Sequence, residues 1–156
     1  MSHETFMQEA VQLSLENMRN GTGWPFWAVI VKDGKIVGKW ANNVTSLNDP
    51  TAHAEVMAIR DACKNLNSFQ LTGCTIYTSC EPCPMCLGAI YRARPDKVYF
   101  ANTKEDAAAI GFDDHFIYQE LEKELKQRTL PLHKIDNEEA IKVFQERSEQ
   151  VDKIEY

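Results

Sequence analysis

Four side chains in two short segments have the types and spacing of a metal-dependent catalytic site. His53 and Glu55 form the pattern H-x-E, and Cys83 and Cys86 follow in the pattern P-C-x-x-C. An imidazole and two thiolates are ligands that zinc prefers, and a catalytic zinc keeps a fourth position for water, whereas a structural zinc usually has four protein ligands. Glu55 would then be free to move protons. The pattern predicts a zinc-dependent hydrolysis at a small electrophilic carbon.

The spacing also indicates which elements must position these side chains. Residues i and i+3 share one face of a helix, so Cys83 and Cys86 at the start of a helix can bind the same ion. The positive end of a helix favours a thiolate over a thiol. His53 lies at the start of another predicted helix, so the ion would hold two helix N-termini together. Zinc lowers the pKa of bound water to about 7, and Glu55 could accept that proton and return it to a leaving nitrogen.

Three other interpretations of the cysteines remain open. A C-x-x-C pair can be redox-active, although the thioredoxin-like context is missing here. The spacing of Cys80, Cys83 and Cys86 is also found in iron–sulfur ligation, which would require a fourth cysteine shortly afterwards. Alternatively, Cys80 could be the fourth ligand of a closed structural zinc site. The chain would then be a zinc-stabilised scaffold, and Glu55 would have no role.

Length, composition and charge limit the classes of function. A chain of 156 residues fits one domain, and its 44% hydrophobic and 26% charged residues are typical of globular proteins. It contains no apolar run of about 18 residues that could span a membrane, and its first residues lack the pattern of a secretory signal. The five cysteines therefore favour a reducing compartment, and we expect a cytoplasmic protein. The net charge of -6 favours a small neutral substrate over a nucleic acid.

Periodicity and turn signals predict alternating helices and strands in a single domain, residues 1–156. Asp33-Gly34 is a strong hairpin signal, and Gly21-Thr22-Gly23 is expected to end the first helix. The element order favours a mixed sheet with helices on both faces. The predicted helices are residues 5–19, 52–65, from Pro82–Pro84 to about Arg92, 103–109, 115–127 and 137–148. The predicted strands are residues 26–32, 35–41, 75–79, 97–101 and, near the end, 130–135.

The residues around the ligands extend the pattern into a family resemblance. The strings Asp49-Pro50-Thr51-Ala52-His53-Ala54-Glu55 and Thr78-Ser79-Cys80-Glu81-Pro82-Cys83-Pro84-Met85-Cys86 resemble the zinc-dependent cytidine/deoxycytidylate deaminase superfamily, in its purine- and cytosine-acting branch. Within that branch the chain resembles the bacterial guanine deaminases over nearly its whole length, most weakly at about residues 136–152. The segments that carry this closer resemblance are residues 42–45, 86–91, 111–118 and 153–156.

The resemblance implies a fold, an assembly and an activity. The fold would be a three-layer α/β/α cytidine-deaminase-like domain with a central mixed five-stranded sheet and one zinc ion per subunit. The assembly would be a homodimer that exchanges its C-terminal segments, here residues 136–156. The implied reaction converts guanine to xanthine and ammonia in purine catabolism or salvage. A related heterocycle (an aminotriazine, cytosine or a nucleoside) is the nearest alternative substrate, and a tRNA adenosine is a more distant one. We expect a small purine base as partner, and neither nucleic acid nor membrane.

Residue by residue, the resemblance assigns zinc ligation to His53, Cys83 and Cys86 and proton transfer to Glu55. It assigns the substrate contacts to five further residues, Phe26, Asn42, Ala54, Asp114 and Tyr156.

Four of these substrate contacts have an implied role, and three of them also have an ordinary structural alternative. Phe26 and Tyr156 would enclose the ring, although Phe26 could instead belong to the core. Asn42 would hydrogen-bond the imidazole side or the carbonyl of the purine, or it could cap the end of a hairpin. Asp114 would accept from the guanine N–H edge, or it could cap the following helix. Whether Tyr156 reaches the pocket of its own subunit or of the other stays open.

Two tryptophans depart from the family pattern. The usual Gly-Gly-Pro-Phe-Gly-Ala stretch is here Gly23-Trp24-Pro25-Phe26-Trp27-Ala28. Strand alternation puts Trp27 on the opposite face from Phe26, so the packing behind the pocket must change. Trp24 lies nearer the expected pocket rim, where it could alter access or the range of substrates.

Overall fold

The computed structural model of the chain describes residues 2–21 and 23–156. The chain forms two compact units, Met1–Asp114 and His115–Tyr156. The first helix ends at Arg19 with Asn20 as its C-cap, and Gly21 follows with φ of 62°. Thr22, part of the predicted helix stop, lies outside the described residues.

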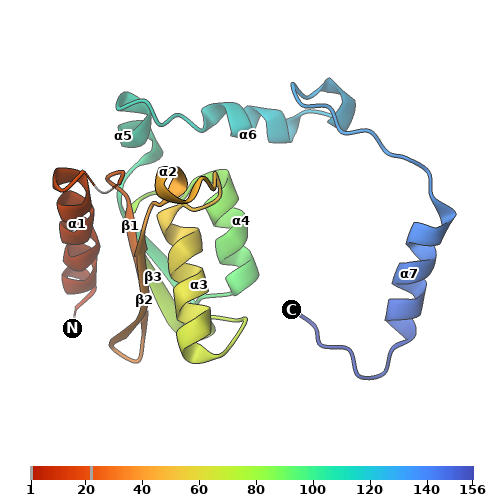
Figure 1. Ribbon diagram of the computed structural model, residues 1–156, viewed down its shortest axis with the longest axis horizontal. Helices are drawn as coiled ribbons and strands as arrows, with labels where there is room; N and C mark the ends of the chain where they lie inside the picture. The colour runs from red at the N-terminus through yellow and green to blue at the C-terminus, as the bar shows by residue number, and fades with distance from the viewer. Residues whose placement is uncertain (1, 22) are drawn as a thin grey trace. The chain divides into compact units, whose positions relative to one another are not determined.

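The first unit is built on a mixed sheet of four strands in the order β2-β1-β3-β4 (Figure 1). Strand β1 pairs antiparallel with β2 and β3, whereas β3 pairs parallel with β4. The β1–β2 connection is the predicted two-residue turn, in which Asp33 and Gly34 have φ of 50° and 73°, as a type I′ hairpin requires. The strands are Trp27–Lys32 (β1), Lys35–Ala41 (β2), Cys74–Cys80 (β3) and Lys97–Asn102 (β4).

The predicted fifth strand at residues 130–135 is wrong. In the structure this segment has no regular secondary structure. Pro131 has no N–H to donate to a neighbouring strand, and the N–H of Leu132 is taken by the carbonyl of Leu125, 3.1 Å away. The apolar alternation that indicated a strand therefore has no backbone partner to form a ladder.

Helices cover both faces of the sheet, as the element order predicted. Helix α1 (His3–Arg19) contacts β1, β3 and β4, while α3 (Ala54–Leu66) packs on β1 and β2 and also contacts α4 (Pro84–Ala93) (Figure 1). Alternation along β1 divides the core between the two faces: Val29 packs with the α1 side, and Ile30 packs with the alanines of α3. The first unit therefore has three layers.

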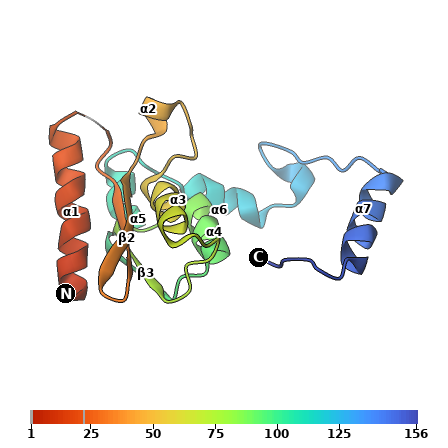
Figure 2. The same ribbon diagram turned by 60° about the horizontal axis from the view of Figure 1, so that its bottom comes forward.

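The remaining helices are short or lie in the second unit. Helix α2 (Val44–Leu47) forms between β2 and α3, and α5 (Lys104–Ala109) begins with a capping box. The predicted helix at residues 115–127 is divided into α6 (His115–Glu122) and a 3-10 turn, Leu125–Gln127. The last helix is α7 (Glu138–Glu149) (Figure 2). No helix in the described part of the chain combines the length and apolar character of a membrane span.

Close packing against β2 fixes how near α3 lies to the sheet. The first turn of this helix carries Glu55. A Cβ atom added at Gly38 of β2 would lie 2.6 Å from the backbone nitrogen of Ala62 and 2.8 Å from the carbonyl oxygen of Ala58. Both neighbours are backbone atoms of α3, so they cannot move without the helix. The absence of a side chain at residue 38 lets the helix lie this close to the sheet.

We predict that Gly38→Ala destabilises the protein by about 2 kcal/mol or more, because the added methyl group must push α3 away from β2. Urea unfolding measures this change. Gly88→Ala in α4 is the matched control, since nothing lies within 4 Å of its added Cβ; alanine there should be neutral or stabilising by about 0.5–1 kcal/mol. Equal midpoints for Gly38→Ala and the wild type would contradict the close approach.

Candidate active site

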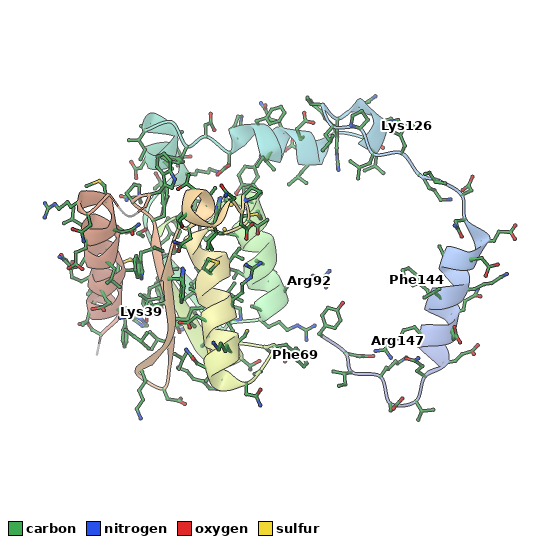
Figure 3. The ribbon with its side chains drawn as sticks, in the orientation of Figure 1. Lys39, Phe69, Arg92, Lys126, Phe144 and Arg147 are labelled. Atoms are coloured by element: carbon green, nitrogen blue, oxygen red, sulfur yellow. The ribbon has the colours of Figure 1, made fainter. Side chains whose placement is uncertain are left out.

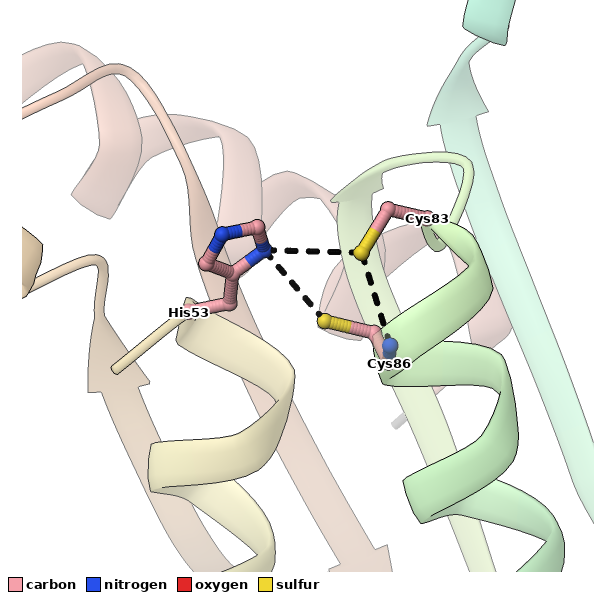
Figure 4. Close-up of side chains that lie close together, drawn as sticks. All are labelled: His53, Cys83 and Cys86. Carbon is pink, nitrogen blue, oxygen red and sulfur yellow. Dashed lines mark hydrogen bonds between the residues drawn. The ribbon is translucent and has the colours of Figure 1, made fainter. Parts of the chain in front are cut away.

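His53, Cys83 and Cys86 bring three metal-ligand atoms together, as their spacing predicted (Figure 4). Nδ1 of His53 lies 3.6 Å from Sγ of Cys83 and 3.5 Å from Sγ of Cys86. A zinc ion with ordinary Zn–N and Zn–S bonds and tetrahedral angles would separate these atoms by about 3.5 Å. Both the donor types and their separations therefore fit zinc.

Two helix N-termini hold the three ligands. His53 is the N-cap of α3, and Cys83 is the N-cap of α4, where its sulfur accepts from the Cys86 N–H at 3.4 Å. Pro84 occupies the first turn of α4, where the missing N–H costs nothing. The positive ends of both helices therefore face the sulfur atoms and stabilise negative charge on them.

The two thiols differ in their readiness to ionise. Hydrogen bonds from the Cys86 side chain and from His53 lower the pKa of Cys83, which favours its thiolate form. The same contact with Cys83, together with burial, raises the pKa of Cys86. The pair therefore favours one anionic sulfur, and binding of a dication would displace the proton of the second.

Cys80 does not belong to the ligand cluster. Its sulfur lies 3.8 Å from the carbonyl oxygen of Thr103, to which the thiol donates. Burial, followed by the charge of Glu55, raises the pKa of Cys80 to about 11, which keeps the thiol protonated. Among the described residues, the cluster within ligand distance contains three side chains and not four. This arrangement disfavours the closed structural zinc site and the iron–sulfur interpretation.

Glu55 is a buried carboxyl group beside the ligands and is only 7% exposed. Its Oε2 lies 3.4 Å from Sγ of Cys86. Burial raises the pKa of Glu55, because the charged form loses its hydration. A carboxyl group with a raised pKa exchanges protons closer to neutral pH than an ordinary glutamate does, so Glu55 has the environment of a proton carrier.

Thr78 of β3 is a site residue that sequence reasoning missed. Its hydroxyl lies 3.2 Å from Oε1 of Glu55 and 3.0 Å from the carbonyl oxygen of Cys80, and it can donate to one of them at a time. The signal in the sequence was strand alternation, since Thr78 is a polar residue on the face that carries Ile76. The contact orients the carboxyl group of Glu55 from the sheet side.

Asn42 and Phe26 make structural contacts in the first unit, and their substrate contacts stay predictions. The Asn42 side chain is buried, and its Oδ1 accepts from the N–H of Val44 at 3.1 Å, as in a local cap. This bond orients the amide, whose nitrogen has no acceptor among the residues that the structure describes. Phe26 packs against the core beneath α3 and contacts Phe112 edge-on, with ring centroids 5.0 Å apart.

Asp114 lies near the ligand cluster. Burial and the nearby Cys83 thiolate raise the pKa of this carboxyl group, and its charge in turn acts on His53. Ala54 is the first residue of α3 and is buried, at a point where the backbone N–H has no partner within the helix. Tyr156 belongs to the second unit and is exposed there. The substrate contacts assigned to Asp114, Ala54 and Tyr156 stay predictions.

Trp27 and Phe26 lie on opposite faces, as alternation predicted. Trp27 packs with the cluster on the α1 side, whereas Phe26 packs on the α3 side. The indole nitrogen of Trp27 is buried without a hydrogen-bond partner in the part of the chain that the structure describes. Trp24 is 42% exposed, and its ring meets Phe112 edge-on with centroids 5.3 Å apart.

We predict that Cys86→Ser strongly reduces the zinc content of the purified protein, since serine removes one of three ligands, whereas Cys80→Ser leaves it unchanged. Inductively coupled plasma mass spectrometry measures the zinc content of both variants and the wild type. Cys80→Ser is the matched control, because it makes the same chemical change in the same segment. Zinc loss in Cys80→Ser would instead indicate a closed site with four protein ligands.

Comparison with known proteins agrees with this geometry. Residues 1–102 match the cytidine and deoxycytidylate deaminase zinc-binding region. The chain is 54% identical to guanine deaminase of Bacillus subtilis (strain 168) over 156 residues, which covers 100% of both chains. The X-ray structure of guanine deaminase from Bacillus subtilis matches with a TM-score of 0.96, covering 100% of this chain and 99% of that one.

A second kind of relative matches a shorter region. The chain is 43% identical to the tRNA-specific adenosine deaminase of Aquifex aeolicus over 101 residues, or 65% of this chain and 66% of that protein. Both kinds of relative, and the ligand cluster itself, lead to the same assignment. The chain belongs to the zinc-binding cytidine and deoxycytidylate deaminase family.

Proposed function

We propose that the chain is a zinc-dependent guanine deaminase, a hydrolase that converts guanine and water to xanthine and ammonia. The observation that carries this proposal is a buried carboxyl group, Glu55, beside a cluster of three protein ligands that leaves one zinc position for water. The substrate assignment is supported by the likeness to the guanine deaminase of Bacillus subtilis, which extends over the full chain.

The chain's own residues would divide the work of the reaction. Zinc, held by His53, Cys83 and Cys86 as one ion per chain, would supply an acidified water at neutral pH. Glu55 would take up one proton of that water as the water oxygen adds to the carbon that bears the amine, and would deliver this proton to a ring nitrogen of the purine. It would then pass the second proton, from the added hydroxyl, to the amine, which leaves as ammonia when the C–N bond breaks. Thr78 would hold the carboxyl group in place during these transfers. The backbone amides at the start of α3 would stabilise the negative charge that develops.

The proposed guanine contacts follow from the donors and acceptors that the site offers. The amide nitrogen of Asn42, oriented by Val44, would donate to the carbonyl or the imidazole side of the base. Asp114 would accept from the N–H edge, a role for which a carboxylate is suited and an apolar side chain is not. Phe26 would cover one face of the ring. The N–H of Ala54 would add a fixed donor at the start of α3.

A tRNA adenosine is the second candidate substrate, because the tRNA deaminase of Aquifex aeolicus shares 43% of residues with this chain over 101 residues. Two observations favour the base over the tRNA. The likeness to guanine deaminase covers the entire chain, and the net charge is -6, whereas proteins that bind nucleic acid through phosphates need clustered basic residues.

We predict that Glu55→Gln retains zinc but releases ammonia from guanine about 10³-fold more slowly or worse, because an amide cannot carry the proton. A coupled ammonia assay with xanthine identified by chromatography measures the rate, and metal analysis confirms the zinc content. The exposed Glu105→Gln on α5 is the matched control and should keep wild-type activity. Full turnover by zinc-loaded Glu55→Gln would exclude Glu55 as the proton carrier.

The proposed assembly is a homodimer with exchanged C-terminal segments in which residues 1–156 act as one deaminase domain. None of the residues 115–156, all of which the structure describes, is buried. Phe144 projects from the side of α7 and is 73% exposed (Figure 3). Further exposed apolar residues of this unit include Phe116, Leu121, Ile141, Val151, Ile154 and Tyr156. A segment with so much apolar surface and no core of its own needs a partner surface to cover it.

The proposed location is the cytoplasm. All five cysteines are free, and two of them are assigned as zinc ligands. A reducing compartment would keep these thiols available for the metal.

We predict that Tyr156 completes the partner's site and that two inactive variants therefore complement each other. Glu55→Gln supplies an intact tail, and Tyr156→Ala supplies an intact Glu55, so a mixed dimer would contain one complete site. Random mixing of equal amounts by unfolding and refolding should restore about a quarter of the wild-type rate. Each variant refolded alone is the control. No recovery, with mixed dimers present by native mass spectrometry, would place Tyr156 at the site of its own chain.

A further inference from the structure

Phe112 lies between two aromatic rings that come from the segment leading into β1. Its ring meets Phe26 at an interplanar angle of 86° and Trp24 at 79°, both in edge-to-face geometry. Edge-to-face contacts are the favourable arrangement for aromatic pairs, because the positive ring edge meets a negative ring face. Phe112 is therefore held from two sides.

The loop that carries Phe112 also carries Asp114. It leaves α5 through hydrogen bonds of Gly111 and Phe112, whose N–H groups donate to the carbonyls of Ala108 and Ala107 at 3.0 and 2.9 Å. Gly111 has φ of 94°, a conformation that side chains disfavour. These bonds fix the start of the loop, but Asp114 lies beyond them. The aromatic contacts of Phe112 attach the loop two residues before Asp114.

Trp24 is itself anchored away from the ligand cluster. Nδ2 of Asn17 in α1 donates to the Trp24 carbonyl at 2.8 Å, and the N–H of Phe26 donates to the same oxygen at 2.8 Å. Gly23 permits this contact, because a Cβ there would lie 2.7 Å from the Asn17 side chain. The backbone of Trp24 is therefore fixed, and its ring forms an aromatic wall against which Phe112 packs edge-on.

We propose that Trp24 and Phe112 are positioning residues that hold Asp114 in place for recognition of the base. This inference rests on the proposed function, since Asp114 is the acceptor assigned to the guanine N–H edge. A series of contacts links Asn17 of α1 to Trp24 and Trp24 to Phe112, two residues before Asp114. Asp114 is close enough to His53 and Cys83 for their charges to interact.

A rigid acceptor matters for binding more than for the chemical step. A carboxylate held in place loses little freedom when the base binds, and a mobile one must be ordered at that moment. The proton transfers assigned to Glu55 do not involve Trp24 or Phe112. Loss of the aromatic wall should therefore raise KM and leave kcat nearly unchanged.

The test compares steady-state kinetics of Trp24→Ala, Trp24→Phe and the matched control Phe69→Ala, an exposed aromatic for which the described part of the chain shows no ring contact. Trp24→Ala should raise the KM for guanine about three- to ten-fold, with kcat within about two-fold of the wild type and zinc content unchanged. Trp24→Phe should restore most of the affinity, and Phe69→Ala should have no effect. An unchanged KM, or a loss confined to kcat, in folded and zinc-loaded Trp24→Ala would overturn the proposal.

A double-mutant cycle distinguishes the positioning of Asp114 by Trp24 from a general loss of order in the site. In an Asp114→Asn background, Trp24→Ala should raise the KM or the guanine Kd by less than about two-fold, because the group that it positions is already lost. The same cycle measured as guanine binding to Glu55→Gln protein by calorimetry gives a readout without turnover. Fully additive losses would show that Trp24 does not act through Asp114.

The outcomes also distinguish the inference from the proposed function. If the wild type deaminates another heterocycle and not guanine, the proposed substrate is wrong, and the same variants are compared with that heterocycle. If the wild type deaminates guanine but Trp24→Ala keeps the wild-type KM, the inference alone is wrong. If the zinc-loaded wild type neither binds nor deaminates any free base, both are wrong.

Discussion

The meeting of two helix N-termini around one imidazole and two sulfur atoms is the constraint on which the rest of the site depends. Nδ1 of His53 lies within 3.6 Å of both cysteine sulfurs although the residues come from different helices. Without a metal, the mutual hydrogen bond favours ionisation of Cys83 and raises the pKa of Cys86. A divalent ion could instead bind both thiolates and a neutral imidazole. The metal would thus fix α3 relative to α4, and with α3 it fixes the position of Glu55.

The sheet also positions Glu55, through the packing of α3 and through a direct contact. Gly38 lets α3 lie against β2 with no side chain between them, so the first turn of α3 enters the site at a defined depth. Thr78 reaches Glu55 from β3, and Cys86 reaches it from α4. The carboxyl group is therefore held from the sheet and from a helix, which leaves its protonation state as its main freedom. A proton carrier requires this combination of fixed position and variable charge.

Much of the site could be predicted because its signals are local. The spacing of Cys83 and Cys86 follows from helix geometry, and Asp33-Gly34 forms a turn whose backbone angles few other pairs adopt. The predicted fifth strand does not form because the N–H of Leu132 donates to the nearby carbonyl of Leu125. Apolar alternation in the sequence does not reveal this hydrogen bond. The contact of Phe112 with Trp24 could not be predicted either, because it joins residues far apart in the chain. Alternation along β3 could have indicated Thr78 as a polar residue on the α3 side of the sheet. Its contact with Glu55 could not be predicted, because it depends on how closely α3 packs against the sheet.

X-ray absorption spectroscopy at the zinc edge of the purified wild-type protein tests the central claim most directly. We expect one zinc ion per chain, with two sulfur neighbours at about 2.3 Å and two nitrogen or oxygen neighbours at about 2.0–2.1 Å, of which one is the His53 nitrogen and the other is solvent. Addition of a purine base should perturb the light-atom neighbours and leave the two sulfurs in place. A third sulfur neighbour would indicate that Cys80 closes the site, and an active protein without zinc would contradict the account altogether.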